Sequence, residues 1–297
     1  MAETAMMSTQ PEAERAVLER IDTADIVRRW DTELGIDVRY LFEDVPELCL
    51  LSDPASGLEF FDPPVAGDEG LYQKLQEIPW YYLEEKWEYE RALKSADANE
   101  RILEVGSGFG AFLRFAQEAG HTCTGIELNT AAAEAGRQAG LDLHSVLLDQ
   151  FIESNPEPFD RVVSFQVLEH VLDPVALLRD MVRSARPGGV VCMAVPNAGS
   201  FISYDNAILD MPPHHISRWR DTACRKLCPI IGAKSVVIDY GPLEPIHFRW
   251  YADLQSQRYA RRWKVPRKVA RKAILAALKF GIADRIHGHT LYAEFTC

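Results

Sequence analysis

The sequence has no apolar run that approaches the roughly 18 residues needed to span a bilayer, which argues against a membrane-spanning helix. Its first twenty residues also lack the basic and then apolar layout of a signal peptide, because acids stand among their apolar positions. The 297 residues are 47% hydrophobic and 26% charged, an ordinary composition for a globular protein. We therefore expect a cytoplasmic protein.

The sequence also contains no C-x-x-C pair, and its six cysteines are scattered. In a cytosolic chain of this size, such cysteines are typically reduced, small and buried. Cys224 and Cys228 are four residues apart, as on one face of a helix, but no second pair accompanies them. We predict no zinc at these two cysteines.

Positive charge is in deficit, since the net charge is −12, and this argues against a general nucleic-acid binder. The exception is a basic stretch without acids between Leu254 and Ile282. Its nine bases are Arg258, Arg261, Arg262, Lys264, Arg267, Lys268, Arg271, Lys272 and Lys279. We predict that this stretch contacts an anionic acceptor, because arginine suits phosphates. A membrane surface is the less favoured partner, because Pro266 interrupts the helix that would lie on it. The simplest alternative to both partners is a solvated helical face.

Short apolar runs alternate with helical stretches between residues 101 and 201, which is typical of a doubly wound parallel sheet. We predict strands at 101–105, 122–127, 143–147, 161–165, 190–195, 235–240 and 290–296. We predict helices at 11–29, 112–119, 131–139 and 174–185. The chain thus divides into an N-terminal extension over 1–99, an α/β core over 100–243, and a basic helical insertion with the final strand of the core over 244–297.

An apolar strand runs into a glycine turn within residues 102–110, and a helix follows. Gly106 and Gly108 let the backbone turn sharply and approach a ligand beside the helix N-terminus. Together with Ala111, they also satisfy the dinucleotide fingerprint G-x-G-x-x-G/A. Glu127 ends the next strand, about 20 positions after Gly106, where an acid accepts hydrogen bonds from ribose hydroxyls. These residues are compatible with either NAD or S-adenosylmethionine as the ligand.

Three further features favour S-adenosylmethionine. Glu104, two positions before the first glycine, is not part of the dinucleotide fingerprint. The glycine turn follows about a hundred residues of other sequence. Residues 159–171 then give a fourth strand with its exit, and Pro187-Gly188-Gly189 precedes the fifth.

The segments Glu104 to Gly110, Phe159-Asp160, Leu168-Glu169-His170-Val171 and Pro187-Gly188-Gly189 together resemble the ordered motifs of class I S-adenosylmethionine-dependent methyltransferases. The resemblance implies a Rossmann-like fold with a mostly parallel, seven-stranded sheet, and S-adenosylmethionine as cofactor.

The same resemblance implies the roles of single residues. Gly106 and Gly108 face the methionine part of the cofactor, Glu127 binds its ribose, and Glu104 is a further cofactor-binding residue. The adenine is expected near Leu128, while Asp149 is displaced from the acid that normally follows the third strand directly. Gln166, at the exit of the fourth strand, is expected beside the sulfonium, with a solvated loop position as the alternative.

Residues 53–60 resemble a zinc knuckle of the form C-x-x-C-G-L-x-F, which precedes the catalytic domain in bacterial methyltransferases of polysaccharide and sugar pathways. Asp53 and Ser56 stand where the cysteines would be, so the thiolate ligands are missing. We therefore expect no bound metal. The resemblance implies a sugar-containing acceptor.

Two further segments are candidates for contact with substrates. Residues 80–89 are unusually aromatic and form either a helix packed on the core or a lid in which Tyr81 or Tyr82 touches the cofactor. His214 and His215 follow the fifth strand, where substrate loops of this fold lie. A hydroxyl nucleophile benefits from a base, and histidine is the commonest one; structural hydrogen bonding is the alternative. We predict that Glu169 and His170 are structural.

The predicted function is transfer of a methyl group from S-adenosylmethionine to a hydroxyl of a small, sugar-containing acceptor. The alternatives are a quinone- or aromatic-type O- or C-methyltransferase, and an inactive methyltransferase fold used as a binding module. The expected partner is a small molecule, anionic if it meets the basic stretch, and nucleic acid is not expected.

Overall fold

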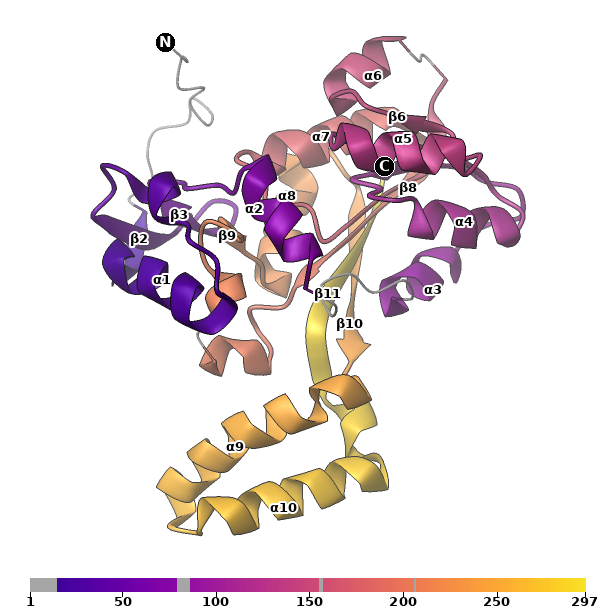
Figure 1. The fold of residues 1–297 in the computed structure, drawn as a ribbon. Helices are drawn as coiled ribbons and strands as arrows, with labels where there is room; N and C mark the ends of the chain where they lie inside the picture. The colour runs from indigo at the N-terminus through magenta and orange to yellow at the C-terminus, as the bar shows by residue number, and fades with distance from the viewer. Residues whose placement is uncertain (1–14, 79–85, 155–156, 206) are drawn as a thin grey trace.

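The computed structural model describes residues 15–78, 86–154, 157–205 and 207–297. Figure 1 shows three parts: a central sheet flanked by helices, a smaller N-terminal sheet at its side, and a helical arm that extends away from both. The C-terminus lies at the central sheet. In the described part of the chain, no helix is both long and apolar enough to cross a membrane.

The central sheet has seven strands in the order β10-β11-β8-β7-β4-β5-β6. Their bounds are β4 Arg101–Val105, β5 Thr122–Ile126, β6 Leu143–His144, β7 Phe159–Phe165, β8 Ala185–Pro196, β10 Ser235–Pro242 and β11 His287–Thr296. The strands from β6 to β8 are parallel, whereas β11 runs antiparallel to both of its neighbours. This order confirms the predicted Rossmann-like, mostly parallel seven-stranded sheet.

Helices cover both faces of this sheet because its strands are apolar on both sides. In β8, Val191, Met193 and Val195 enter the core on one face, while Cys192 and Ala194 enter the core on the other. The first face is covered by α6 (Leu148–Ser154), α7 (Pro174–Ser184) and α8 (Asp221–Ile230), and the second by α3 (Trp87–Leu93), α4 (Ala111–Glu118) and α5 (Thr130–Gln138). Such two-sided burial is what a continuous apolar run in a parallel strand requires.

Three predicted elements differ from the structure. The strand predicted at 143–147 ends at His144, because residues 145–147 leave the sheet before α6 begins. The fifth strand starts at Ala185 and includes Gly188, whereas we predicted that it starts after Gly189. Of the helix predicted over 11–29, residues 15–29 are described; they form β1 (Ala16–Asp22) and then α1 (Thr23–Arg29), because Asp22 caps a new helix by accepting a hydrogen bond from the Ala24 amide.

The N-terminal sheet has the order β1-β2-β3-β9, with β2 at Glu47–Ser52, β3 at Glu59–Asp62 and β9 at Ser217–Arg218. It has its own core, in which α1 and α2 (Glu69–Gln76) pack on β2 and β3. Because β9 comes from the segment that follows β8, this segment joins the small sheet to the large one. The segment therefore lies where the two parts meet.

The turn at residues 53–57 is closed by hydrogen bonds within the protein. The Asp53 carboxylate accepts from the amide and the hydroxyl of Ser56, and the Gly57 amide donates to the Asp53 carbonyl over 2.7 Å.

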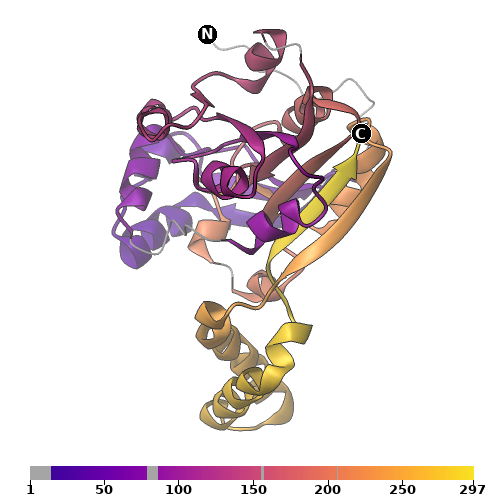
Figure 2. The ribbon, with the colours of Figure 1, turned by 90° about the vertical axis from the view of Figure 1, so that its right-hand side faces the viewer.

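The helical arm consists of α9 (Phe248–Trp263) and α10 (Arg267–Ala277), joined at residues 264–266. Figures 1 and 2 show from two sides that it extends away from the body of the molecule. Its base packs on Phe201 and Ile202, which follow β8, through Leu243, Leu254 and Leu278. Asp253 of α9 holds α10 in place through an ion pair with Arg271 at 2.6 Å.

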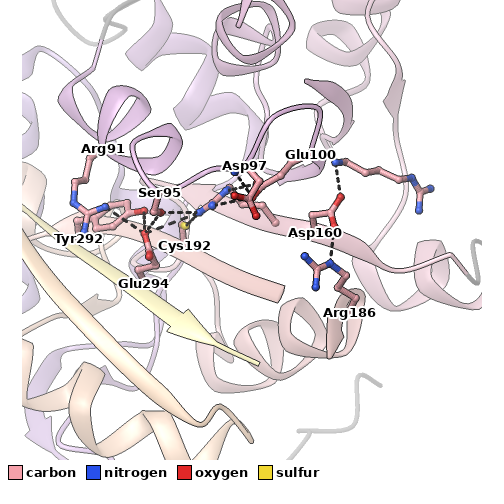
Figure 3. A network of polar contacts seen from close by, with 11 residues as sticks. Arg91, Ser95, Asp97, Glu100, Asp160, Arg186, Cys192, Tyr292 and Glu294 are labelled. Carbon is pink, nitrogen blue, oxygen red and sulfur yellow. Dashed lines mark hydrogen bonds and ion pairs between the residues drawn. The ribbon is translucent and has the colours of Figure 1, made fainter. Parts of the chain in front are cut away.

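A buried polar network joins the strands at the edge opposite the glycine turn (Figure 3). Arg161 of β7 is 0% exposed and donates to Glu100 over 2.7 Å. Arg91 of α3 pairs with Glu294 of β11, whose carboxylate also accepts from the Tyr292 hydroxyl. The network therefore connects α3, β7 and β11.

Candidate active site

The glycine turn lies between β4 and α4, and its three glycines have positive φ angles of 81° at Gly106, 52° at Gly108 and 78° at Gly110. A Cβ on Gly106 would lie 2.4 Å from Cγ2 of Val167, so this glycine makes room for the loop after β7. A Cβ on Gly108 would meet no atom of the described residues within 4 Å. Gly108 is thus the glycine beside open space, at the N-terminal end of α4, where backbone N–H groups can approach a ligand.

Glu104 ends β4 next to this turn and is 3% exposed. Among the described residues, its Oε2 atom has no hydrogen-bond partner. Burial raises the pKa of this carboxyl well above its usual range, although the nearby Lys86 ammonium acts in the opposite direction. A buried carboxylate oxygen without a donor destabilises the protein unless a ligand supplies one.

Glu127 follows β5 and holds the glycine turn. Its Oε2 accepts from the Gly108 amide over 2.7 Å, and its Oε1 accepts from the Asn129 amide over 2.7 Å. The carboxylate therefore lies beside the open space at Gly108, as the predicted ribose ligand must.

Leu128 and Asp149 are both exposed. Leu128 is 60% exposed, next to Glu127. Asp149 lies in the first turn of α6, and its carboxylate accepts from the following amide of Gln150 over 2.8 Å. No hydrogen bond within the described ranges connects Asp149 to the glycine turn. The structure thus brings Glu104, Gly108 and Glu127 together, and shows no such contact for Asp149.

Gln166 leaves β7 with a positive φ of 57°, which turns the chain toward the glycine turn. Its amide nitrogen Nε2 donates to Oε1 of the buried Glu88 over 3.3 Å. Burial raises the pKa of Glu88, although Lys86 lies close to it. Gln166 is therefore held by α3 and is not a fully solvated loop residue.

His214 and His215 are buried, at 5% and 8% exposure, and lie against His170 from the loop after β7. Burial and the neighbouring histidines lower the pKa of His214 well below its usual range. Burial and the charges of His170 and Arg218 do the same to the pKa of His215. Both rings are therefore neutral at pH 7.

The comparisons with known proteins agree with this geometry. Residues 80–268, more than half of the chain, match a protein family described as "Methyltransferase domain". The chain belongs to this methyltransferase-domain family. Its fold is also that of a SAM-dependent methyltransferase from Archaeoglobus fulgidus, with a TM-score of 0.56 and 18% identity over 76% of this chain and 100% of that one. The family match confirms the predicted methyltransferase domain and its S-adenosylmethionine cofactor, and the structural match confirms the fold.

Curated relatives match a shorter segment. The ubiquinone biosynthesis O-methyltransferase of Pseudomonas entomophila is 31% identical over 106 residues, which are 34% of this chain and 46% of that protein. The enzyme of the same name from Maricaulis maris is 33% identical over 106 residues, 34% of this chain and 42% of that protein. The chain thus spans less than half the length of these relatives.

The residues of the methyltransferase domain fit S-adenosylmethionine. The unpartnered Oε2 of Glu104 is a suitable acceptor for the ammonium of the methionine part, and Glu127 is a suitable acceptor for the ribose hydroxyls. The residues Tyr81 and Tyr82, predicted as a lid, lie outside the described residues. Sequence reasoning missed Lys86 and Glu88, which the start of α3 brings beside Glu104 and Gln166. No motif distinguishes these two residues from the charged residues around them.

Proposed function

We propose that this protein transfers a methyl group from S-adenosylmethionine to a hydroxyl of a small acceptor. The observation that supports this most is the buried, unpartnered oxygen of Glu104 at the glycine turn whose Gly108 amide Glu127 accepts from. When bound, the cofactor supplies an electrophilic methyl group on its sulfonium. Glu104 and Glu127 hold the two ends of its polar part, and this positioning supplies much of the rate enhancement.

The acceptor that we favour is a quinone- or aromatic-type hydroxyl, and not the sugar hydroxyl of our first prediction. The relatives from Pseudomonas entomophila and Maricaulis maris are named for ubiquinone biosynthesis and O-methylation. The sugar acceptor depends on the likeness of residues 53–60 to a knuckle, and those residues precede the matched family domain. An acceptor screen with labelled cofactor should therefore give methyl transfer to catechol-type hydroxyls before sugar hydroxyls.

Cofactor binding is tested separately by calorimetry. S-adenosylhomocysteine should bind and NAD should not, and Glu127→Ala should weaken binding by about 1–3 kcal/mol, because ribose hydroxyls would be left without an acceptor. Binding of NAD alone would exclude the proposed reaction. Binding of S-adenosylhomocysteine without transfer to any acceptor would favour the inactive binding module.

His214 or His215 as general base remains a prediction. Their position after β8 and beside the loop that packs on Gly106 supports the base, because both loops follow the carboxyl ends of parallel strands. Their lowered pKa values weigh against it, because a base works best when its pKa lies near the working pH. The cluster that His214 and His215 form with His170 supports a different role for these imidazoles.

A further inference from the structure

Three imidazoles from two separate loops meet in one buried cluster. One ring nitrogen from each of His170, His214 and His215 lies within 4.8 Å of the other two. The ring centroids are 4.6 Å apart for His170 and His214, 4.9 Å for His170 and His215, and 4.3 Å for His214 and His215. The sequence separates His170 from the other two by more than forty residues, so the fold alone brings them together.

Hydrogen bonds fix which nitrogen of each ring carries the proton. Nδ1 of His170 donates to the His214 carbonyl over 2.6 Å, and Nδ1 of His214 donates to the Leu209 carbonyl over 2.8 Å. Nδ1 of His215 lies 3.3 Å from the Asp210 carboxylate. A carbonyl can only accept, so His170 and His214 carry their lone pairs on Nε2, and the carboxylate favours the same form of His215. Histidines that bind metals are oriented in this way, by a carbonyl or a carboxylate on the second nitrogen.

A buried acid lies beside the cluster. Oε1 of Glu169 is 3.7 Å from Nε2 of His170, and the residue is 1% exposed. Neither carboxyl oxygen of Glu169 has a hydrogen-bond partner among the described residues.

We infer that His170, His214 and His215 bind one Zn²⁺ ion, and that the neighbouring acids Glu169 and Asp210 balance its charge. The Nδ1 atoms of the three imidazoles are held by carbonyl or carboxylate oxygens, so their Nε2 atoms are the ligand atoms that a shared cation would take. Zinc takes imidazole nitrogens at about 2.0–2.1 Å, which places the nitrogens of a tetrahedral site roughly 3.4 Å apart. Small side-chain rotations therefore close the site. This inference replaces our expectation of a metal-free protein, which considered Asp53, Ser56 and the cysteines.

The ion would join segments that the sequence holds far apart. His170 follows β7, in the loop whose Val167 packs on Gly106, whereas His214 and His215 precede β9, which pairs with the N-terminal sheet. The Tyr72 hydroxyl of α2 also lies 3.1 Å from Nδ1 of His170. A metal here would thus stabilise the junction between the methyltransferase domain and the N-terminal sheet.

The test is metal binding by untagged protein that has been stripped with a chelator. We expect one equivalent of Zn²⁺ per chain by calorimetry and by elemental analysis, a Co²⁺ form with the intense visible bands of a tetrahedral site, and a higher Tm with Zn²⁺. His170→Gln and His215→Gln should each weaken Zn²⁺ binding by about 10–100-fold or more, and Asp210→Asn by about 10–100-fold. His287→Gln is the matched control, because that ring is exposed and stacks on Tyr240.

Two results would overturn the metal site. One is wild-type protein that retains no Zn²⁺ after dialysis and shows no change in Tm; it requires no variant to fold. The other is a Zn²⁺ affinity of His170→Gln equal to that of His287→Gln. Neither measurement depends on methyl transfer. The result for the metal site is therefore independent of whether S-adenosylhomocysteine binds.

The same variants separate the metal site from a general base. A base would be one histidine whose replacement lowers turnover by about 10²–10⁴-fold while Zn²⁺ affinity stays unchanged. If the three histidines bind a metal, replacing any one of them should lower the Zn²⁺ affinity. This applies to His170, His214 and His215. Loss of turnover with unchanged Zn²⁺ affinity in the His214→Gln variant would therefore refute the site.

Discussion

At the scale of single residues, Gly108 has two properties that belong to a ligand contact. Its φ of 52° favours glycine, and the space where its side chain would lie is empty. Gly106 has the same kind of φ, but Val167 fills its space. We had assigned both glycines to the cofactor. The structure gives Gly106 a packing role that its sequence position does not reveal.

Gly108→Val should abolish S-adenosylhomocysteine binding in calorimetry, because the valine side chain would occupy the open space. Gly120→Val is the matched control: Gly120 has a φ of 93° and nothing within 4 Å of its Cβ position, but it lies at the end of α4, so the backbone strain is similar. If both variants lose S-adenosylhomocysteine binding equally, the loss comes from backbone strain and not from contact with the ligand.

We predict that Glu104 releases a proton when the cofactor binds. Burial raises the pKa of this carboxyl well above the usual range and so favours its protonated form in the free protein, whereas an arriving ammonium favours the carboxylate. Binding should therefore release a proton, and affinity should rise with pH until it reaches the pKa of the free protein. Calorimetry in buffers of different ionisation enthalpy measures this release. Glu104→Gln should bind more weakly and release no proton; an equal release from both proteins would show that another group is responsible.

At the scale of elements, the position of the helical arm limits what the basic stretch can contact. Eight of the nine bases are exposed, and Arg271 is half-buried beside Asp253. Trp263 at 63%, Val269 at 57% and Phe280 at 88% are exposed on the same arm. Because the arm extends away from the body in both views, its bases can meet a large anionic surface (Figures 1 and 2). We had favoured an anionic acceptor over a membrane; the exposed aromatic rings among these bases now favour the membrane surface.

Replacing Lys268 and Lys272 with Gln should reduce co-sedimentation with vesicles that contain anionic lipid, by about 1 kcal/mol for each base, and the effect should shrink at high salt. Lys74 and Lys94, exposed on α2 and just after α3, provide the matched pair of substitutions. A higher KM for the acceptor with unchanged vesicle binding would restore the anionic acceptor. No change in either quantity would identify a solvated face.

At the scale of the whole molecule, the Arg161 network shows what joins the methyltransferase domain to its flanking elements. Arg161 has no exposed surface, and Glu100, Cys192 and Ser95 all accept from its guanidinium. Glu100 precedes β4, and Cys192 lies in β8, so one side chain ties three strands (Figure 3). Removing a single partner would leave a charge buried without compensation.

Arg161→Met should therefore lower the free energy of unfolding by about 3–5 kcal/mol in urea denaturation. Adding Glu100→Gln to Arg161→Met should recover part of this loss, because the remaining group is then uncharged. A single-variant loss below about 1 kcal/mol, typical of surface ion pairs, would mean that water enters the network.

Across these scales, the sequence by itself determined the repeating strands and helices, the glycine turn, Glu104 and Glu127. These features are local: a strand, its turn and the next helix follow one another in the chain, and burial on both faces requires continuous apolar runs. It also determined where the arm turns, because Pro266 cannot continue α9.

Only the tertiary structure decided which distant side chains meet. It placed His170 against His214 and His215, Lys86 and Glu88 beside Glu104 and Gln166, and Val167 in the space beside Gly106. It also placed the basic arm away from the body. In the predicted first helix, Ala16–Asp22 is the strand β1 instead. The physical reason is that these contacts depend on loop paths and on burial between separate elements, and neither leaves a periodic pattern in the chain.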